Sequence, residues 1–84
     1  MRILIVEDEA RIAQDVAEAV NAGGYVAEIA SGGEDAWFRG GTEPYAAIIL
    51  DLGLPGIDGL TILKRWRQEG VSTPVLVLTA RGAW

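Results

Sequence analysis

Short apolar runs alternate along this chain with stretches in which apolar residues recur every three or four positions. Four runs, at residues 3–6, 25–30, 46–50 and 75–78, have the length and composition of strands. The first is continuously apolar, as expected of a parallel strand that is covered on both faces. The stretches between the runs have the period of amphipathic helices. This alternation, with short loops, predicts an α/β fold with a parallel sheet and helices on both faces.

The first helix and the second strand have distinct sequence features. In residues 10–22, Ile12, Val16 and Val20 form one apolar stripe, and two glycines follow it, where a helix commonly ends. Glu28 lies in the middle of the second run. A charged residue there indicates an edge strand with one side in contact with water.

The other two helices are predicted from their caps. Ser31 and Glu34 have the spacing of a capping box, and the helix that they open is expected to end after Trp37, since two glycines follow at 40 and 41. Asp58 can cap a third helix over residues 59–69. The residues predicted to face inward from this third helix are Leu60, Leu63 and Trp66.

Polar residues stand where three of the predicted strands end. Glu7 and Asp8 follow the first strand, Asp51 follows the third, and Thr79 follows the fourth. Sites in parallel α/β sheets lie at the carboxyl ends of the strands, so we expect these side chains to converge. Carboxylates and a hydroxyl group at one edge predict a metal-assisted phosphoryl-acceptor site.

Each of these residues also has a simpler interpretation when it is taken alone. Asp8 can cap the first helix, and Glu9 can be a solubilising charge. Asp51 can form an Asx-turn, and Thr79 can be an ordinary hydroxyl group at a strand end. The functional interpretation depends on the set, which is spread over three strand ends.

Composition narrows the chemistry further. The chain has 84 residues, enough for one small domain, and it contains neither cysteine nor histidine. A metal site must therefore use oxygen ligands, which favours a hard cation such as Mg²⁺. The net charge of −5 makes direct binding of nucleic acid by this segment unfavourable. We expect a cytoplasmic protein, because the apolar run at the N-terminus is too short for a signal peptide or a membrane span.

Three motifs together resemble the receiver domain of two-component response regulators. They are residues 3–9, residues 51–59 and residues 74–80, in the order and spacing typical of that family. The match extends over all 84 residues, and the loop after Asp51 most resembles receivers that are attached to winged-helix DNA-binding domains. The resemblance implies a flavodoxin-like, doubly wound parallel sheet with strand order 2-1-3-4.

The resemblance also implies roles for the residues at the strand ends. Asp51 would accept a phosphoryl group from a sensor histidine kinase, and Thr79 would donate a hydrogen bond to a phosphoryl oxygen. Glu7 and Asp8 would hold Mg²⁺ together with Asp51 and the backbone carbonyl of Gly53. The resemblance therefore implies a signalling domain that controls a transcription-factor output domain, and it does not imply an enzyme.

The sequence departs from the family pattern after the fourth strand. A receiver of this family continues with a helix, a strand that begins beside a lysine, and a last helix. The chain has one lysine, Lys64, and we expect it in the third helix, on the wrong side of the sheet to replace that lysine. Arg81 is a poor substitute. We therefore expect a truncated receiver.

The missing strand would expose the apolar run at residues 75–78 as a sheet edge, which favours pairing with another chain. We expect a homodimer or a domain-swapped oligomer, with Trp84 helping to bury the interface. Trp37 and Trp66 are interpreted as packing residues between helix and sheet.

Two other nucleotide or phosphate chemistries fit the chain less well. A dinucleotide-binding domain needs a glycine-rich turn after the first strand, where this chain has Glu7 and Asp8. A dehalogenase-type phosphatase needs a second acid two residues after Asp51, where Gly53 stands. A structural, self-associating module without phosphotransfer is the remaining alternative. Kinase specificity is expected on the surface of the first helix, at residues such as Arg11, Gln14 and Asp15.

Overall fold

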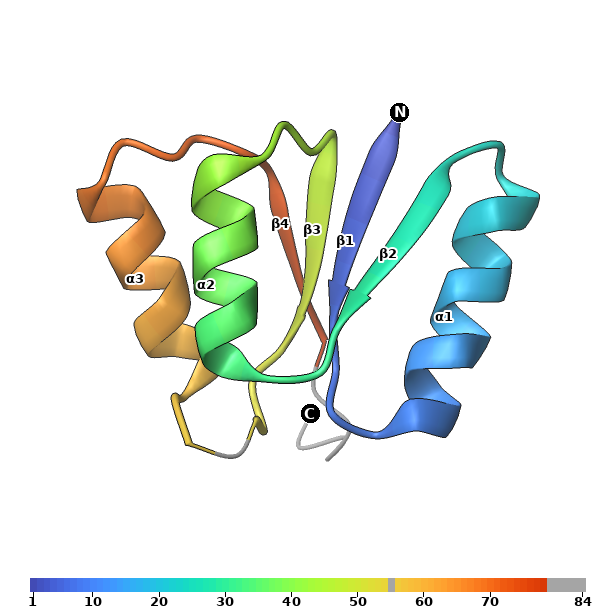
Figure 1. The fold of residues 1–84 in the computed structure, drawn as a ribbon, viewed down its shortest axis with the longest axis horizontal. Coiled ribbons are helices and arrows are strands. Elements are labelled where there is room, and N and C mark those ends of the chain that lie inside the picture. The colour runs from blue at the N-terminus through green and yellow to red at the C-terminus, as the bar shows by residue number, and fades with distance from the viewer. Residues whose placement is uncertain (55, 79–84) are drawn as a thin grey trace.

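A computed structural model describes residues 1–54 and 56–78 as three layers (Figure 1). The elements in chain order are β1 (Arg2–Val6), α1 (Ala10–Ala22), β2 (Val26–Ala30), α2 (Gly33–Thr42), β3 (Ala47–Asp51), α3 (Gly59–Gln68) and β4 (Val75–Leu78). The four strands form one parallel sheet in the order β2-β1-β3-β4. The predicted fold class and strand order are therefore confirmed.

The helices cover the two faces of the sheet as predicted, with α1 on one side and both α2 and α3 on the other (Figure 1). On its side, α1 packs on β1 and β2, and its buried residues are Ala13 and Ala17. The larger core lies under α2 and α3. Its fully buried members are Leu4, Val6, Ala30, Ala36, Ile48, Leu50, Ile62 and Trp66. The apolar strand runs therefore form the centre of the molecule.

The second helix differs from the prediction at both ends. It runs to Thr42 and does not end after Trp37, and its N-cap is Gly32, with no hydrogen bond from a capping side chain. The capping box at Ser31 is therefore wrong, because the helix begins one residue too late for it. Packing explains the first of the two glycines inside the helix: a Cβ atom on Gly40 would lie 2.7 Å from Cε2 of Trp66.

The third helix confirms its predicted cap but not all of its predicted inner face. The side chain of Asp58 accepts a hydrogen bond from the Leu60 N–H at 3.3 Å. Ile62 and Trp66, one turn apart, are fully buried, whereas Leu60 is 44% exposed. Leu60 precedes Ile62 by two positions, roughly 200° around the helix, so the two cannot share a face.

The edge position of β2 is confirmed, and Glu28 is held there by a network of hydrogen bonds. Its carboxylate accepts hydrogen bonds from Arg2 at 2.6 and 2.9 Å, and from Arg39 and Tyr45 at 3.1 and 2.9 Å. These partners come from β1, from α2 and, for Tyr45, from the segment that leads into β3. The charge in the middle of the strand is thus compensated by two arginines, and its side chain remains 25% exposed, as expected for an edge strand with one side in contact with water.

Candidate functional site

Three carboxylates meet at the carboxyl end of the sheet. β1 and β3 are neighbours, and their register pairs Val6 with Leu50, so the residues that follow, Glu7 and Asp51, lie side by side. Asp8 joins them from the start of the next loop. Carboxylate oxygens of these three residues lie within 4.8 Å of one another. The predicted convergence of the acidic residues is therefore present in the structure.

Backbone N–H groups hold two of the three carboxylates. Glu9 donates its N–H to Oε2 of Glu7 at 3.1 Å, and Gly53 donates its N–H to Oδ1 of Asp51 at 3.2 Å. The second of these bonds is the Asx-turn that the simpler interpretation of Asp51 predicted. It coexists with the cluster. The cap interpretation of Asp8 is wrong, because Glu9 is the N-cap of α1 and no side chain caps that helix.

The site is electrostatically unfavourable without a cation. Glu7 is 6% and Asp51 is 7% exposed, whereas Asp8 faces solvent. Burial raises the pKa of Glu7, and the negative charge of Asp51 raises it further, against the opposing hydrogen bond from Glu9. The four ion pairs found in the described residues all involve Arg2 or Arg39, and none reaches this cluster.

The loop after β3 fits closely against the start of α3. A Cβ atom on Gly59 would lie 2.7 Å from the carbonyl oxygen of Asp51 and 2.9 Å from Cα of Leu52, so only glycine fits there. Sequence reasoning missed this residue, and it also missed the Glu9 N–H that orients Glu7. The backbone carbonyl of Gly53 remains a predicted metal ligand. Thr79, Arg81 and Trp84 lie outside the described residues.

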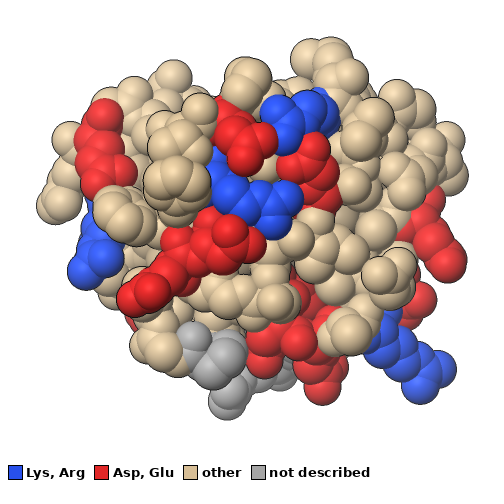
Figure 2. All heavy atoms as spheres, viewed as in Figure 1, with Lys and Arg blue, Asp and Glu red and all other residues tan. Residues whose placement is uncertain are grey.

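A second charged cluster lies near the opposite end of the sheet, and sequence reasoning did not anticipate it. Basic and acidic side chains are interleaved on the face that carries α2 (Figure 2). Arg2 binds both Glu28 and Glu43, and Arg39 binds Glu28 and Asp35. Arg39 and Asp35 are one turn apart in α2, but Glu28 is distant in the chain from both arginines, so no local motif reveals the cluster.

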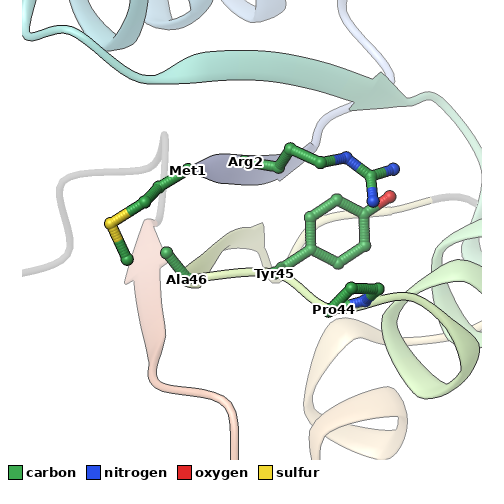
Figure 3. A pocket seen from close by; sticks show the side chains of 5 residues that line it. All are labelled: Met1, Arg2, Pro44, Tyr45 and Ala46. Atoms are coloured by element: carbon green, nitrogen blue, oxygen red, sulfur yellow. The ribbon is translucent and has the colours of Figure 1, made fainter.

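The second cluster borders an open cavity of about 250 Å³. Its lining residues are Met1, Arg2, Pro44, Tyr45 and Ala46 (Figure 3). The Arg2 guanidinium lies over the Tyr45 ring, 4.8 Å from its centroid. This guanidinium is already paired with two glutamates and is therefore not available to an anionic ligand in the cavity. The cavity is separate from the acidic cluster.

The model of the response regulator receiver domain family matches residues 3–83. This chain belongs to that family. The receiver is 37% identical over 84 residues to the two-component response regulator PhoP of Pseudomonas aeruginosa, and it spans 37% of that protein. It is 42% identical over 81 residues to the transcriptional regulatory protein PmrA of Pectobacterium parmentieri, of which it spans 36%. The chain thus covers well under half the length of these relatives.

Solved structures support the same assignment. The response regulator TrrA of Thermotoga maritima in complex with Mg²⁺ and BeF superposes with a TM-score of 0.90 at 33% identity, over 96% of this receiver and 70% of that chain. The complex of TrrA with histidine kinase ThkA gives a TM-score of 0.89 at 32% identity, over 99% of this receiver and 72% of that chain.

In the described residues, no helix is long and apolar enough to cross a membrane.

Proposed function

We propose that this receiver accepts a phosphoryl group on Asp51 from a sensor histidine kinase. The observation that carries the proposal is the convergence of Glu7, Asp8 and Asp51 from two neighbouring strands within 4.8 Å. Two carboxylates there are buried, and the described residues give the cluster no basic partner. Buried carboxylates without a basic partner lower the stability of the fold, so a purely structural role does not explain them. The arrangement therefore favours a role in chemistry.

The acidic residues fit Mg²⁺. The cluster offers only oxygen donors, as hard cations require, and a cation would relieve the charge that raises the pKa of Glu7. Glu7, Asp8 and Asp51 would hold the ion, with the carbonyl of Gly53 as a further ligand. When bound, Mg²⁺ supplies positive charge that offsets the developing charge on the transferring phosphoryl oxygens.

The proposed step is a single displacement at phosphorus. A carboxylate oxygen of Asp51 attacks the phosphorus of the kinase phosphohistidine, the P–O bond forms, and the P–N bond breaks with its electron pair left on the histidine nitrogen. The Gly53 N–H, which already binds Oδ1, keeps the carboxylate oriented. Thr79 would donate its hydroxyl to a phosphoryl oxygen. The receiver acts as substrate and switch, and not as an enzyme with turnover of its own.

The proposed partner and output follow from the relatives. TrrA is found in complex with the histidine kinase ThkA, and PmrA is a transcriptional regulatory protein. By analogy, the kinase would dock on the exposed side chains of α1, at Arg11, Gln14 and Asp15, and the receiver would control a transcription-factor domain in the cytoplasm. It would not itself bind nucleic acid.

A small phosphodonor tests the proposal directly. The chain is incubated with acetyl phosphate with and without Mg²⁺, and its intact mass is followed. We expect Mg²⁺-dependent addition of one phosphoryl group, abolished in Asp51→Asn. The matched control is Asp58→Asn in the same loop, which keeps a good N-cap for α3 and so preserves the fold. Modification that survives in Asp51→Asn would refute the assignment of the acceptor.

The alternative is a self-associating structural module without phosphotransfer. The receiver-family match does not favour this alternative, which is motivated by one observation: Leu76, Val77 and Leu78 are 60%, 39% and 37% exposed along β4. Such a module would form dimers or domain-swapped oligomers that are indifferent to Mg²⁺ and to acetyl phosphate. Absence of any modification of Asp51, in a folded chain that does self-associate, would decide in its favour.

A further inference from the structure

Gly59 is the first residue of α3 and is buried against the strand end that carries Asp51. A Cβ atom on Gly59 would lie 2.7 Å from the carbonyl oxygen of Asp51, 2.9 Å from Cα of Leu52 and 3.3 Å from Cδ2 of Leu52. The two nearest of these atoms belong to the backbone. Rotation of a side chain therefore cannot make room for a larger residue at this position.

Neither backbone conformation nor helix propensity explains a glycine at this position. Gly59 is not among the described glycines that have a positive φ, so alanine can adopt the same conformation. Alanine also favours a helix more strongly than glycine does. What distinguishes glycine here is the absence of a side chain. This absence lets the first turn of α3 close against the peptide that joins Asp51 to Leu52.

The same peptide is also held by β4, and α3 is held by the core. The N–H of Leu52 donates to the carbonyl of Leu78 at 3.3 Å, and Asp51 pairs with Leu78 in the sheet register. On α3, the side chains of Ile62 and Trp66 are fully buried. The first residue of α3 therefore fills a gap between a hydrogen-bonded strand end and an anchored helix, and neither side can retreat freely.

The position of this peptide affects the geometry of the acceptor carboxylate. Gly53 donates its N–H to Oδ1 of Asp51 at 3.2 Å, so the two peptides on either side of Leu52 connect the donor to the carboxylate. Carboxylate oxygens of Glu7 and Asp8 lie within 4.8 Å of an oxygen of Asp51. A shift of the peptide after Asp51 therefore changes both the hydrogen bond and the spacing of the acidic cluster.

We propose that Gly59 is a positioning residue for the acceptor carboxylate of Asp51. Because it has no side chain, the base of the loop after β3 can close. This closure holds the Asp51 carboxylate and the Gly53 N–H in the geometry that attack on phosphorus requires. The proposal rests on the proposed phosphotransfer to Asp51 and adds to it a residue outside the acidic cluster.

The expected loss of rate follows from the size of the clash. An alanine Cβ at 2.7 Å from the Asp51 carbonyl oxygen is roughly 0.5 Å or more short of ordinary van der Waals contact. Since α3 is anchored by its buried side chains, the peptide after Asp51 takes up part of this shift. Misplacement of a reacting group by about 1 Å can cost about 100-fold in rate, so we expect Gly59→Ala to slow phosphorylation about tenfold or more.

Gly40→Ala is the matched control, because it introduces a comparable clash away from the acceptor. A Cβ atom on Gly40, inside α2, would lie 2.7 Å from Cε2 of Trp66. Both substitutions place one methyl group against a buried neighbour, and we expect both to lower stability in urea. Only Gly59→Ala should change the acceptor.

Two measurements are made on the 84-residue chain and on both variants. Intact mass gives the rate of modification by acetyl phosphate at saturating Mg²⁺. In the unphosphorylated chain, NMR follows the hydrogen bond from the Gly53 N–H to Asp51 through the temperature dependence of the Gly53 amide proton shift. We expect Gly59→Ala to weaken this bond and to slow modification, and Gly40→Ala to leave both unchanged. Urea denaturation checks that each variant is folded.

A second pair of variants loosens the same contact without a clash. The side chain of Asp58 accepts a hydrogen bond from the Leu60 N–H and so caps α3 just before Gly59. Asp58→Ala removes this cap, whereas Asp58→Asn keeps one, and both remove the charge. We expect a weaker Gly53 hydrogen bond and slower modification in Asp58→Ala only, with a smaller effect than that of Gly59→Ala. This pair decides the proposal if Gly59→Ala does not fold.

Three results overturn the proposal. Folded Gly59→Ala with the wild-type rate and the wild-type Gly53 hydrogen bond would mean that the glycine serves packing alone. Equal slowing in Gly40→Ala would mean that the rate follows overall stability. Identical behaviour of Asp58→Ala and Asp58→Asn would mean that the first turn of α3 does not act on the acceptor.

Failure of phosphotransfer itself gives a different result. A folded wild-type chain that takes up no phosphoryl group refutes the proposed acceptor role of Asp51. The NMR comparison needs no phosphorylation, so it still decides whether Gly59 positions the carboxylate.

Discussion

Two glutamates in this receiver show how position decides what a carboxylate does. Glu28 lies in the middle of β2 and accepts hydrogen bonds from Arg2, Tyr45 and Arg39, which hold its pKa at about 2. Glu7 lies just beyond β1, where burial and the neighbouring Asp51 raise its pKa. Both are largely shielded from solvent, yet one is neutralised by arginines and the other is surrounded by acids. The ion-paired carboxylate of Glu28 stabilises the fold, and the carboxylate of Glu7, which has no ion-pair partner among the described residues, is available to a cation.

The largest expected effect is on Mg²⁺ affinity and comes from changing Glu7 in the acidic cluster. Glu7→Gln removes one of three oxygen-donor carboxylates, and we expect Mg²⁺ affinity to fall about 100-fold, because a neutral amide attracts the cation far less. Isothermal titration with MgCl₂ measures it. Glu28→Gln changes a carboxylate outside the acidic cluster, so it serves as the control and should leave the Mg²⁺ affinity unchanged. Equal losses in both variants would mean that the cluster does not hold the ion.

An intermediate effect, on the free energy of unfolding, is expected from changing the ion-paired Glu28. Glu28→Gln leaves Arg2 and Arg39 without their shared anion and should lower the free energy of unfolding by about 2 kcal/mol near neutral pH. Urea denaturation measures this difference. Since the folded pKa of Glu28 is about 2 and its usual value is 4.5, its contribution is complete above pH 4.5. The contribution should disappear as the pH falls from 4.5 through about 2, so the two unfolding curves should converge there.

The smallest expected effect is a gain in the free energy of unfolding, opposite in sign to the loss expected for Glu28→Gln. Without Mg²⁺, Glu7→Gln relieves repulsion between neighbouring carboxylates and should raise the free energy of unfolding by about 1 kcal/mol at neutral pH. The raised folded pKa of Glu7 means that its charged form costs stability, and this cost grows as the pH rises above 4.5. The gain should therefore vanish in acid. Saturating Mg²⁺ should reverse the order of the two proteins, and a variant that is less stable under all conditions would contradict the explanation.

The sequence predicted what depends on local pattern and on general rules of sheet topology. Apolar runs identified the four strands, and the convergence of Glu7, Asp8 and Asp51 followed because neighbouring parallel strands end at one edge. The cap at Asp58 was also correct, since its hydrogen bond reaches only two residues along the chain.

What the sequence missed at β2 and in α2 depends on contacts between distant residues. The partners of Glu28 could not be identified, because Arg2, Arg39 and Tyr45 come from other elements. On the β2 edge, Asn21 accepts a hydrogen bond from the Ala27 N–H, and Arg39 donates one to the Ile29 carbonyl. These side-chain directions are fixed only once both helices are packed. The length of α2 was underestimated because glycine lowers helix propensity, whereas packing against α3 overrides it. No pattern within either helix encodes that contact.

Gly40 and Trp66 have a consequence for how this domain can vary. The fully buried indole occupies the space that any side chain at position 40 would need, and its Nε1–H donates to the carbonyl of Trp37 at 3.0 Å. The two positions therefore behave as one unit of sequence. An alanine at 40 becomes acceptable only together with a smaller residue at 66, and the effects of the two changes on stability will not add. Which substitutions are tolerated at either position therefore depends on the residue at the other.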